Sequence, residues 1–386
     1  MKVVYINPNI NHHKLPFYDA LRNIYGQDNV IYATPLIHEE NRIKMGFDSY
    51  QQENWLYHIQ PSNFTEFSNL FYEADIVLCS IRDYYRLMEK RLQSGKLTFY
   101  FSERWFKEGI GKFRLLHPKI LNLVYQFRKL STYPNFFYLA QGEYAAYDFN
   151  YLGICKNRIF SFGYFTSINQ TVRGNHLLPK EKINLLWCGR MLKLKRVDLL
   201  IKAFCDLQKK NNNIHLTLVG NGPASKCLIK YLHKHALPSN YTLYDFLPVT
   251  EVRYLMQQAD IYVLPSNGLE GWGAVINEAM AESCAIVGSN KIGAVKSMLS
   301  HGINAMIFPS GNLQALKECI SSLTGDPILL AKLKKESNAL VNNLWSASTA
   351  AFRFSMVVDA ILNKEDYNIY REGVMKLLKY DSNKII

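Results

Sequence analysis

The chain has 386 residues, and at about 100 to 200 residues per domain this length predicts two domains. Hydrophobic residues make up 48% and charged residues 20% of the chain, an ordinary globular composition that excludes collagen-like and disordered proteins. The cysteines lie far apart without a C-x-x-C pair, so neither a disulfide framework nor a zinc site is indicated, and a reducing cytosol fits best. The formal net charge of +13 permits anionic partners without choosing among phosphates, acidic lipids and nucleic acid.

The N-terminus, from Met1 to Pro8, is strand-like and lacks the apolar region and small-residue cleavage site of a signal peptide. No stretch approaches the roughly 18 consecutive apolar residues that span a bilayer. We therefore expect a cytoplasmic protein that is not integral to a membrane.

Short apolar segments alternate with helical patterns in the first half of the chain, which is typical of a parallel sheet with crossover helices. The expected strands cover 3–6, 30–33, 76–79, 97–101, 136–139 and 159–162. The expected helices cover 16–24, 64–72, 84–92, 116–130 and 144–152. We predict an N-terminal Rossmann-like domain over residues 1–165 and a linker over 166–182.

The same alternation restarts after the linker, with expected strands over 183–188, 214–219, 242–246, 261–264, 285–288 and 305–308. The expected helices cover 197–207, 224–235, 249–257, 273–281, 313–323 and 328–341. We predict a second doubly wound domain over residues 183–345, and C-terminal helices over 346–386 that cross back to the first domain. The predicted fold class is α/β, with loops of both domains facing a cleft, because open parallel sheets bind ligands at the carboxyl ends of their strands.

The most informative segment is 265–281, where a strand, a glycine-rich loop and a helix follow in order. The first amides of this helix, from Gly273 to Val275, would form an anion site for a phosphate. Glu270 precedes the helix and Glu278 lies within its second turn, and carboxylates at these positions suit the hydroxyl groups of sugars. The alternative is that Glu278 is a solvated helix residue and Glu270 a charge favoured by the helix dipole.

A second cluster, over 187–198, places Arg190 directly after a buried strand and Lys195 at the start of the next helix. Two permanent cations at the carboxyl end of a strand suit a diphosphate, with Arg as a planar fork and Lys as a point charge. For either residue alone, a solvated surface role is an equal alternative.

A glycine turn, Gly220-Asn221-Gly222-Pro223, joins another strand to a helix. Gly220 and Gly222 match the first two glycines of the dinucleotide-binding fingerprint, and Ser225 stands where the third glycine is expected. Asp245 ends the next expected strand, where an acid that binds ribose belongs. A nicotinamide-dependent oxidoreductase is therefore an alternative. The missing third glycine weakens it, and so does the position of the turn after the second strand of its domain.

Taken together, these segments resemble the donor domain of a family 4 glycosyltransferase, of the type called glycosyl transferases group 1. The residues that carry the resemblance are Gly189-Arg190 with Lys195, Val219 to Pro223, Ala259-Asp260-Ile261 leading to Pro265-Ser266, and Glu270-x7-Glu278-Ala279-Met280, followed by Gly293-Ala294 and His301 to Ala305. The resemblance implies a GT-B fold, a UDP- or GDP-sugar donor, retention of anomeric configuration, and no metal or other cofactor.

By position, the resemblance assigns catalytic roles to three side chains: Arg190 and Lys195 would hold the donor diphosphate, and Glu270 the sugar. Glu278 would bind the ribose. The remaining donor contacts would come from Gly189, Gly220, Asn221, Gly222, Gly271, Trp272, Gly273, Ala274 and Val275. Cations and helix amides would neutralise the leaving nucleoside diphosphate, as a metal does in other transferases.

The first domain departs from the commonest family pattern, a Gly-Gly loop after the first strand, and has residues 9–14 in its place. His12 or His13 could hydrogen-bond an acceptor or the sugar, although a solvated loop histidine is the plainer alternative. Glu103 follows an expected strand and would face the cleft, or form a structural ion pair.

Lysine and arginine are dense between Arg104 and Leu130, where Glu108 is the single acid. Interleaved with aromatic and aliphatic residues, these cations suit contact with an anionic membrane surface. The alternative is a helix packed on its own sheet with a solvated basic face.

We therefore expect a cytoplasmic glycosyltransferase of the hexosyltransferase class, with a polysaccharide or polyprenyl-linked acceptor in cell-surface glycan synthesis and no nucleic-acid partner. It would be peripheral on the inner face of the plasma membrane. A non-catalytic nucleotide-sugar-binding protein on the same fold is a further alternative, against which Glu270 and Lys195 speak.

Overall fold

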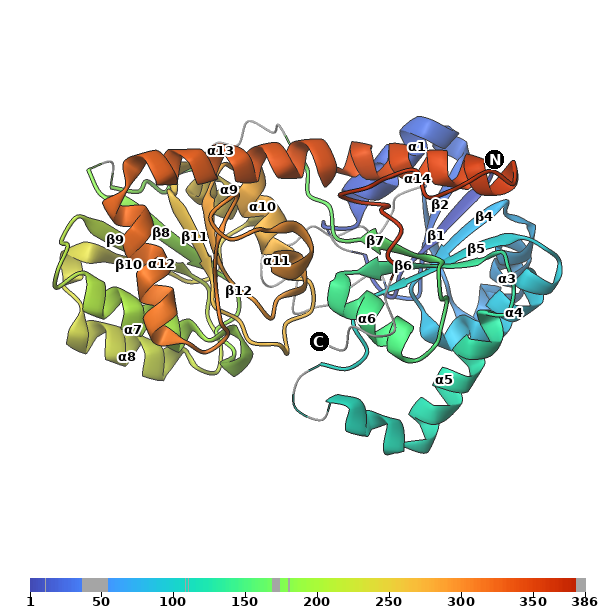
Figure 1. Ribbon diagram of the computed structural model, residues 1–386, viewed down its shortest axis with the longest axis horizontal. Helices are drawn as coiled ribbons and strands as arrows, with labels where there is room; N and C mark the ends of the chain where they lie inside the picture. Colours follow the sequence, from blue (N-terminus) through green and yellow to red (C-terminus); the bar gives the residue numbers. More distant parts are fainter. Residues whose placement is uncertain are drawn as a thin grey trace. The chain divides into compact units, whose positions relative to one another are not determined.

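The structure is a computed structural model and describes residues 1–10, 12–36, 55–107, 109, 111–168, 174–179 and 181–379. The chain forms two compact units (Figure 1). The first unit holds the described residues up to Thr166 together with those from Leu344 on, and the second unit holds those from Ser167 to Asn343.

Seven parallel strands form the sheet of the first unit, in the order β3-β2-β1-β4-β5-β6-β7. They are β1 (Val3–Ile6), β2 (Val30–Thr34), β3 (Leu56–His58), β4 (Ile76–Cys79), β5 (Leu97–Ser102), β6 (Phe136–Gln141) and β7 (Ile159–Phe162). Most are continuous apolar runs because helices cover both faces of the sheet. The sequence did not predict β3, whose three residues are only half-buried.

The helices of the first unit are α1 (Leu15–Tyr25), α3 (Phe64–Glu73), α4 (Tyr85–Gln93), α5 (Pro118–Leu130), α6 (Glu143–Tyr151) and α14 (Ala347–Leu362). Contacts run from α3 to α4 and from α4 to α5, while α1 packs on α14 (Figure 1). Successive residues of a strand point to opposite faces of the sheet. Val4 belongs to the core that includes Phe67 and Phe71, whereas the ring of Tyr5 contacts that of Phe17.

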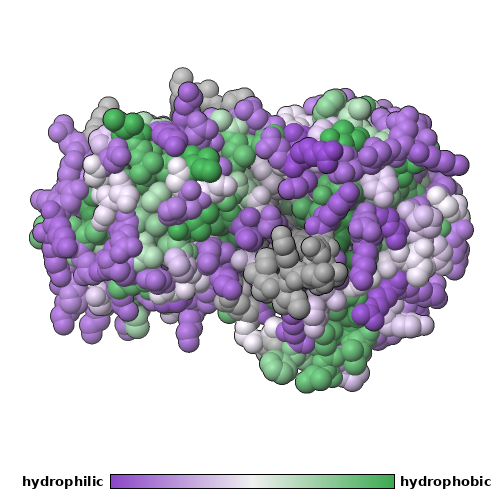
Figure 2. All heavy atoms as spheres, in the orientation of Figure 1, coloured by the Kyte–Doolittle hydropathy of each residue, from purple (hydrophilic) through white to green (hydrophobic). Residues whose placement is uncertain are grey.

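A 3-10 helix, η4 (Gly111–Leu116), precedes α5. The helix predicted over 116–130 is thus confirmed, although it begins at Pro118, with His117 as its N-cap. Figure 2 shows apolar side chains gathered at the lower edge of the molecule, where Figure 1 places α5. Phe113 and Leu116 of η4 are more than three-quarters exposed there, at 76% and 78%.

The C-terminal part of the chain completes the first unit. The ring of Phe354 on α14 contacts the rings of Phe17 and Phe99. Beyond α14, the main chain near Met375 runs antiparallel to β7, since Met375 N donates to Ser161 O and Ser161 N donates to Lys376 O, both at 2.8 Å. The edge strand β7 is therefore paired on both sides within one unit.

Six parallel strands form the sheet of the second unit, in the order β10-β9-β8-β11-β12-β13. They are β8 (Ile183–Cys188), β9 (Ile214–Val219), β10 (Tyr241–Tyr244), β11 (Ile261–Leu264), β12 (Ala285–Ser289) and β13 (Met306–Phe308). Two doubly wound sheets result, which confirms the predicted α/β class.

The helices of the second unit are α7 (Val197–Leu207), α8 (Ser225–His235), α9 (Val249–Gln258), α10 (Val275–Ala281), α11 (Gly293–Met298), α12 (Leu313–Gly325) and α13 (Pro327–Leu344). One layer joins α7 to α8 and α12, and another joins α10 to α9 and α11 (Figure 1). The buried residues of β8 and β9 pack with those of α7 and α12 in one core. Among the described residues, no helix is long and apolar enough to span a bilayer.

Candidate functional site

The strand order of the second sheet reverses between β8 and β11, because β9 follows β8 on one side and β11 lies on the other. Ligands of open α/β sheets bind at such a reversal, outside the carboxyl ends of the strands. The loops after β8, β9 and β11 lie at this edge, and they contain the residues that the sequence assigns to a nucleotide-sugar donor.

The loops after β8 and β9 are interlocked through their backbones. Met191 N donates to Asn221 O at 2.9 Å. Gly220 has a φ of +119°, and a Cβ atom there would lie 2.1 Å from Gly189 O, while a Cβ atom on Gly222 would lie 2.8 Å from Met191 N. Glycine is thus required at 220 and 222 by the neighbouring loop. The glycine turn has a structural explanation that needs no dinucleotide.

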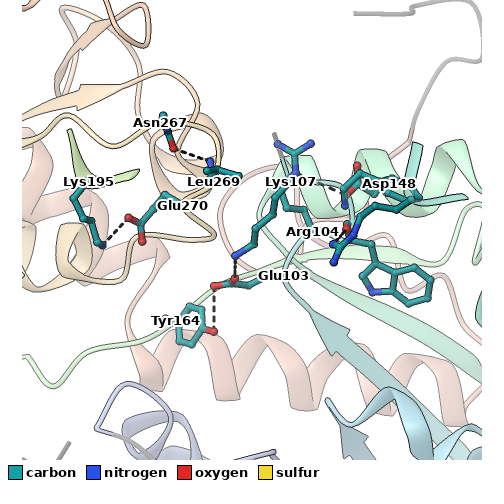
Figure 3. Close-up of polar contacts among 12 residues, drawn as sticks. Glu103, Arg104, Lys107, Asp148, Tyr164, Lys195, Asn267, Leu269 and Glu270 are labelled. Carbon is teal, nitrogen blue, oxygen red and sulfur yellow. Dashed lines mark hydrogen bonds and ion pairs between the residues drawn. The ribbon is translucent and has the colours of Figure 1, made fainter. Parts of the chain in front are cut away.

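Lys195 and Glu270 meet at the strand reversal, one from each side of it. Lys195 Nζ lies 2.6 Å from Glu270 Oε2, and their side chains are only 20% and 14% exposed (Figure 3). Lys195 ends the 3-10 helix η5 (Lys193–Lys195) and does not begin α7, contrary to the predicted placement. An ammonium group has three donors, so Lys195 can bind phosphate oxygens while it holds Glu270.

Main-chain contacts hold this pair in place. Asn267 N donates to Leu194 O at 2.9 Å, which ties η5 to the loop after β11. The same residue accepts from Glu270 N through its carbonyl and from Leu269 N through Oδ1, both at 3.0 Å (Figure 3). Asn267 therefore orders the loop that carries Glu270. Arg190 lies on the exposed part of the loop after β8.

The helix predicted from Gly273 begins instead at Val275. Gly273 has a φ of +82°, a left-handed conformation that ends the loop before the helix starts. Glu278 consequently lies in the first turn of α10 and not in the second. Its side chain is buried, at 6% exposure, so the alternative of a solvated helix residue is wrong. The amides of Gly273, Ala274 and Val275 lie where a helix start has no intrahelical acceptors.

Trp272 is part of the core of the second unit. Its side chain is 1% exposed, and its indole N–H donates to Asn277 Oδ1 at 2.8 Å. Any contact of Trp272 with a donor must therefore come from its main chain. Gly271 O accepts from Gly293 N at 3.0 Å, which fastens this loop to the start of α11.

The histidines of the first unit lie in the loop after β1, next to the strand reversal between β1 and β4. The ring centroids of His12 and His13 are 3.7 Å apart and both residues are half-buried, so neither is a fully solvated loop histidine. Glu103 forms an ion pair, which was one of its two alternatives: its Oε2 lies 3.2 Å from Lys107 Nζ, and its Oε1 accepts from the Tyr164 hydroxyl at 3.4 Å (Figure 3). The Tyr164 ring in turn lies 6.2 Å from that of His13.

Two serines to which the sequence assigns no contact with a donor also lie at the carboxyl edge of the second sheet. Ser266 follows β11 and Ser289 ends β12, and both are buried. Neither hydroxyl has a hydrogen-bond partner among the described residues. Buried hydroxyl groups of this kind are candidates for ligand contacts. Their position directly at strand ends is the signal that could have identified them.

Residues 169–339 match the family model of the glycosyl transferases group 1. An uncharacterized glycosyltransferase of Haemophilus influenzae is 31% identical over 173 residues, covering 43% of this chain and 48% of that protein. The alpha-D-kanosaminyltransferase of Streptomyces kanamyceticus is 24% identical over 166 residues, covering 43% of this chain and 42% of that protein. The chain spans less than half the length of each of these relatives.

Solved structures show the same fold. HepE of Anabaena in complex with UDP aligns with a TM-score of 0.69 at 15% identity, covering 93% of this chain and 100% of that one. The lipopolysaccharide outer core galactosyltransferase WaaB aligns with a TM-score of 0.61 at 16% identity, covering 94% and 100%. These likenesses confirm the predicted pair of Rossmann-like domains of the GT-B type. The nicotinamide-dependent alternative finds no support in the matches.

Proposed function

We propose that this chain is a glycosyltransferase whose donor is a nucleoside-diphosphate sugar, with UDP as the preferred nucleotide. The observation that carries the proposal is the pair of Lys195 and Glu270 at the strand reversal of the second sheet. This pair lies within the region that matches the glycosyl transferases group 1. The choice of UDP is supported by HepE, which binds UDP on the same fold.

In this proposal, Lys195 and Arg190 bind the diphosphate of the donor. Glu270 holds the Lys195 amine in position and contacts hydroxyl groups of the sugar. Glu278, which lies in the first turn of α10 and is buried, binds the ribose. The loop backbones at Gly189, Asn221 and Gly271 and the first amides of α10 surround the phosphates. Because α10 has only seven residues, its individual amides matter more than its dipole.

We further propose that transfer retains the anomeric configuration and needs no metal ion. When the bond between the sugar and the diphosphate breaks, the nucleoside diphosphate takes the bonding electron pair and gains negative charge. In this proposal, Lys195, Arg190 and the amides at the start of α10 neutralise that charge. Metal ions supply the same stabilisation in other transferases. Retention rests on the family resemblance of the motif from Glu270 to Met280.

The acceptor is proposed to be a polysaccharide or a lipid-linked saccharide in cell-surface glycan synthesis. A relative named as an amylovoran biosynthesis glycosyltransferase, AmsK of Erwinia amylovora, is 26% identical over 165 residues and supports this class. The chain would act at the cytoplasmic face of the plasma membrane. The identity of the transferred sugar is determined by the donor assay described below.

Thermal unfolding with UDP, GDP and NAD is the first test. We expect UDP to raise the unfolding temperature more than GDP does, whereas stabilisation by NAD alone would overturn the proposal. Release of nucleotide from a panel of UDP- and GDP-sugars then identifies the donor. NMR of the product anomer tests retention, and transfer after treatment with EDTA tests metal independence.

A further inference from the structure

A cavity of about 110 Å³ in the first unit is lined by three arginines. Arg82 follows β4, Arg104 follows β5 and Arg114 lies on η4, so separate segments of the chain bring cations to one place. Trp105 and Ile120 add apolar walls. The volume has room for several water-sized groups. A tetrahedral phosphate is an anion of this size class, and arginine is suited to binding it in a bidentate manner.

The side chains around the cavity fix the arginines without neutralising all of them. Arg104 Nε is buried and has no hydrogen-bond partner among the described residues; it lies 3.8 Å from Asp148 Oδ2 (Figure 3). Arg114 donates to Trp105 O at 2.9 Å, a contact that orients the guanidinium without adding a negative charge. Arg82 pairs at 3.7 Å with Asp83, but both side chains are well exposed, so this pair is weak.

An exposed apolar face adjoins the cavity. It consists of Phe113 and Leu116 on η4 and Leu121 and Tyr125 on α5, which are 76%, 78%, 53% and 65% exposed (Figure 2). The opposite side of α5 packs into the core of the first unit through Val124, Phe127 and Leu130. The helix therefore packs on its own unit, as the alternative interpretation expected, and still presents apolar residues to the outside. Exposed apolar groups of this size mark an interaction surface.

We propose that this cavity binds the phosphate group of a membrane lipid while the apolar face enters the headgroup region of the bilayer. The occupant is specified by charge complementarity. Arginines that are only partly neutralised line the cavity, and the exposed lysines Lys112 and Lys119 are close in the chain to the exposed apolar residues of η4 and α5. An apolar surface bordered by cations is the arrangement that holds interfacial segments to anionic lipid. The inference does not rest on the proposed function, because the lipid is here a component of the membrane surface and not the carrier of the acceptor sugar.

Co-sedimentation of the full chain with lipid vesicles tests this inference. Two sets of phosphatidylcholine vesicles are prepared with equal surface charge. One set contains phosphatidic acid, whose phosphate is a terminal monoester, and the other contains phosphatidylglycerol, whose phosphate is a diester. We expect binding in the order phosphatidic acid, phosphatidylglycerol, phosphatidylcholine, and weaker binding at raised salt. A terminal phosphate can enter the cavity, whereas a diester meets only the surrounding charge.

The variant Arg82→Gln/Arg114→Gln should bind phosphatidic acid vesicles about 25-fold less tightly, because each cation removed should weaken binding about fivefold. A matched control, Lys226→Gln/Lys230→Gln, removes the same charge from the exposed side of α8 in the second unit and should leave binding within twofold. Phe113→Ser/Leu116→Ser should weaken binding to both anionic vesicles, because it removes the inserted apolar groups. Unfolding temperatures confirm that the variants are folded.

Three outcomes would overturn the inference: absence of vesicle binding, equal binding to both anionic vesicles with no effect of the arginine variant, or complete displacement by millimolar inorganic phosphate. The last would assign the cavity to soluble phosphate. UDP binding, measured in the same samples, separates this inference from the proposed function. A chain that binds UDP but not vesicles retains its proposed activity and loses the lipid site.

Discussion

The two units share a doubly wound sheet but use their charged side chains differently. In the second unit a cation and a carboxylate, Lys195 and Glu270, pair at the strand reversal in loops that carry a sequence motif. In the first unit the cations Arg82, Arg104 and Arg114 gather around a cavity, and no motif marks them. A nucleoside diphosphate requires similar phosphate and ribose contacts whatever sugar it carries. The proposed donor site can therefore recur as a pattern, whereas the cavity of the first unit, which we propose for a lipid phosphate, has no such pattern.

The largest effect that would separate the units is expected from Gly220→Ala. A Cβ atom at this position would meet Gly189 O at 2.1 Å in a backbone conformation with positive φ. Conformational strain and overpacking each cost about 1 to 3 kcal/mol, so the second unit should lose roughly 2 to 6 kcal/mol of stability. Hydrogen exchange should show this loss in peptides from 183–343 and not in those from 1–166.

Gly325→Ala is the matched control for this change. A Cβ atom at Gly325 meets nothing within 4 Å, and the substitution should leave exchange in both units nearly unchanged. If Gly220→Ala lowered protection from hydrogen exchange equally in both units, glycine at this turn would not be a requirement of the second unit alone.

A pH-dependent effect is expected from Asp148 of the first unit. Burial raises the pKa of its carboxyl group from 3.8 to about 6, against the opposing effects of the Phe106 amide and Arg104. Because the folded state binds the proton more tightly than the unfolded state, this carboxyl contributes stability at low pH that is lost as the pH rises from about 4 to about 6. The difference corresponds to up to about 3 kcal/mol.

Asp148→Asn should remove this dependence. Its stability relative to the unmodified chain should rise between pH 4 and pH 7, as measured by thermal unfolding at each pH. Asp83→Asn removes an 84% exposed carboxylate from the same unit and should show little change. A constant stability difference between Asp148→Asn and the unmodified chain across this range would show that Asp148 keeps an ordinary pKa.

The proposed diphosphate site is tested by Lys195→Ala and Arg190→Ala. Charge-assisted phosphate contacts are worth roughly 1.5 to 3 kcal/mol each, or about 10- to 150-fold in kcat/KM for the donor. Lys193→Ala is the control, since Lys193 is an exposed lysine of the same 3-10 helix. Lys195→Ala also leaves Glu270 without its cation, so Lys195→Ala/Glu270→Gln should recover unfolding temperature without recovering activity. Unchanged kcat/KM in both single variants would show that Lys195 and Arg190 do not bind the diphosphate.

The smallest expected effects distinguish the two carboxylates. Glu270→Gln should lower turnover about fivefold and change UDP affinity less, because Glu270 is proposed to contact the sugar. Glu278→Gln should weaken UDP binding by a similar factor, because a charge-assisted hydrogen bond becomes a neutral one. Calorimetric titration of UDP measures the affinities. Loss of UDP binding in Glu270→Gln alone would reverse the assignment.

Much of the second unit could be predicted because its chemistry is local in the sequence. Gly220, Lys195 and Glu270 each follow a strand within a few residues, so periodicity and glycine placement locate them. The start of α10 was misplaced because the sequence does not show that Gly273 is left-handed. The contact between Lys195 and Glu270 joins two loops that are distant in the chain, and it follows only from the strand order.

The first unit was less predictable because its informative contacts are non-local. Arg82 approaches Arg104 and Arg114 through the order of β4 and β5 in the sheet, which no spacing in the sequence reveals. The half-buried strand β3 has only three residues, too few for a period of two to stand out. The pairing of Ser161 with Met375 joins segments on either side of the whole second unit.

That last pairing bears on how the protein is made. A ribosome exposes residues 167–343 as one continuous stretch, so the second unit can fold while synthesis is still under way. The first unit, although its strands emerge earliest, waits for the segment near Met375 to cover β7. Until then β7 exposes an unpaired edge, which is the kind of surface that chaperones shield. The nascent chain should therefore mature from its middle outward.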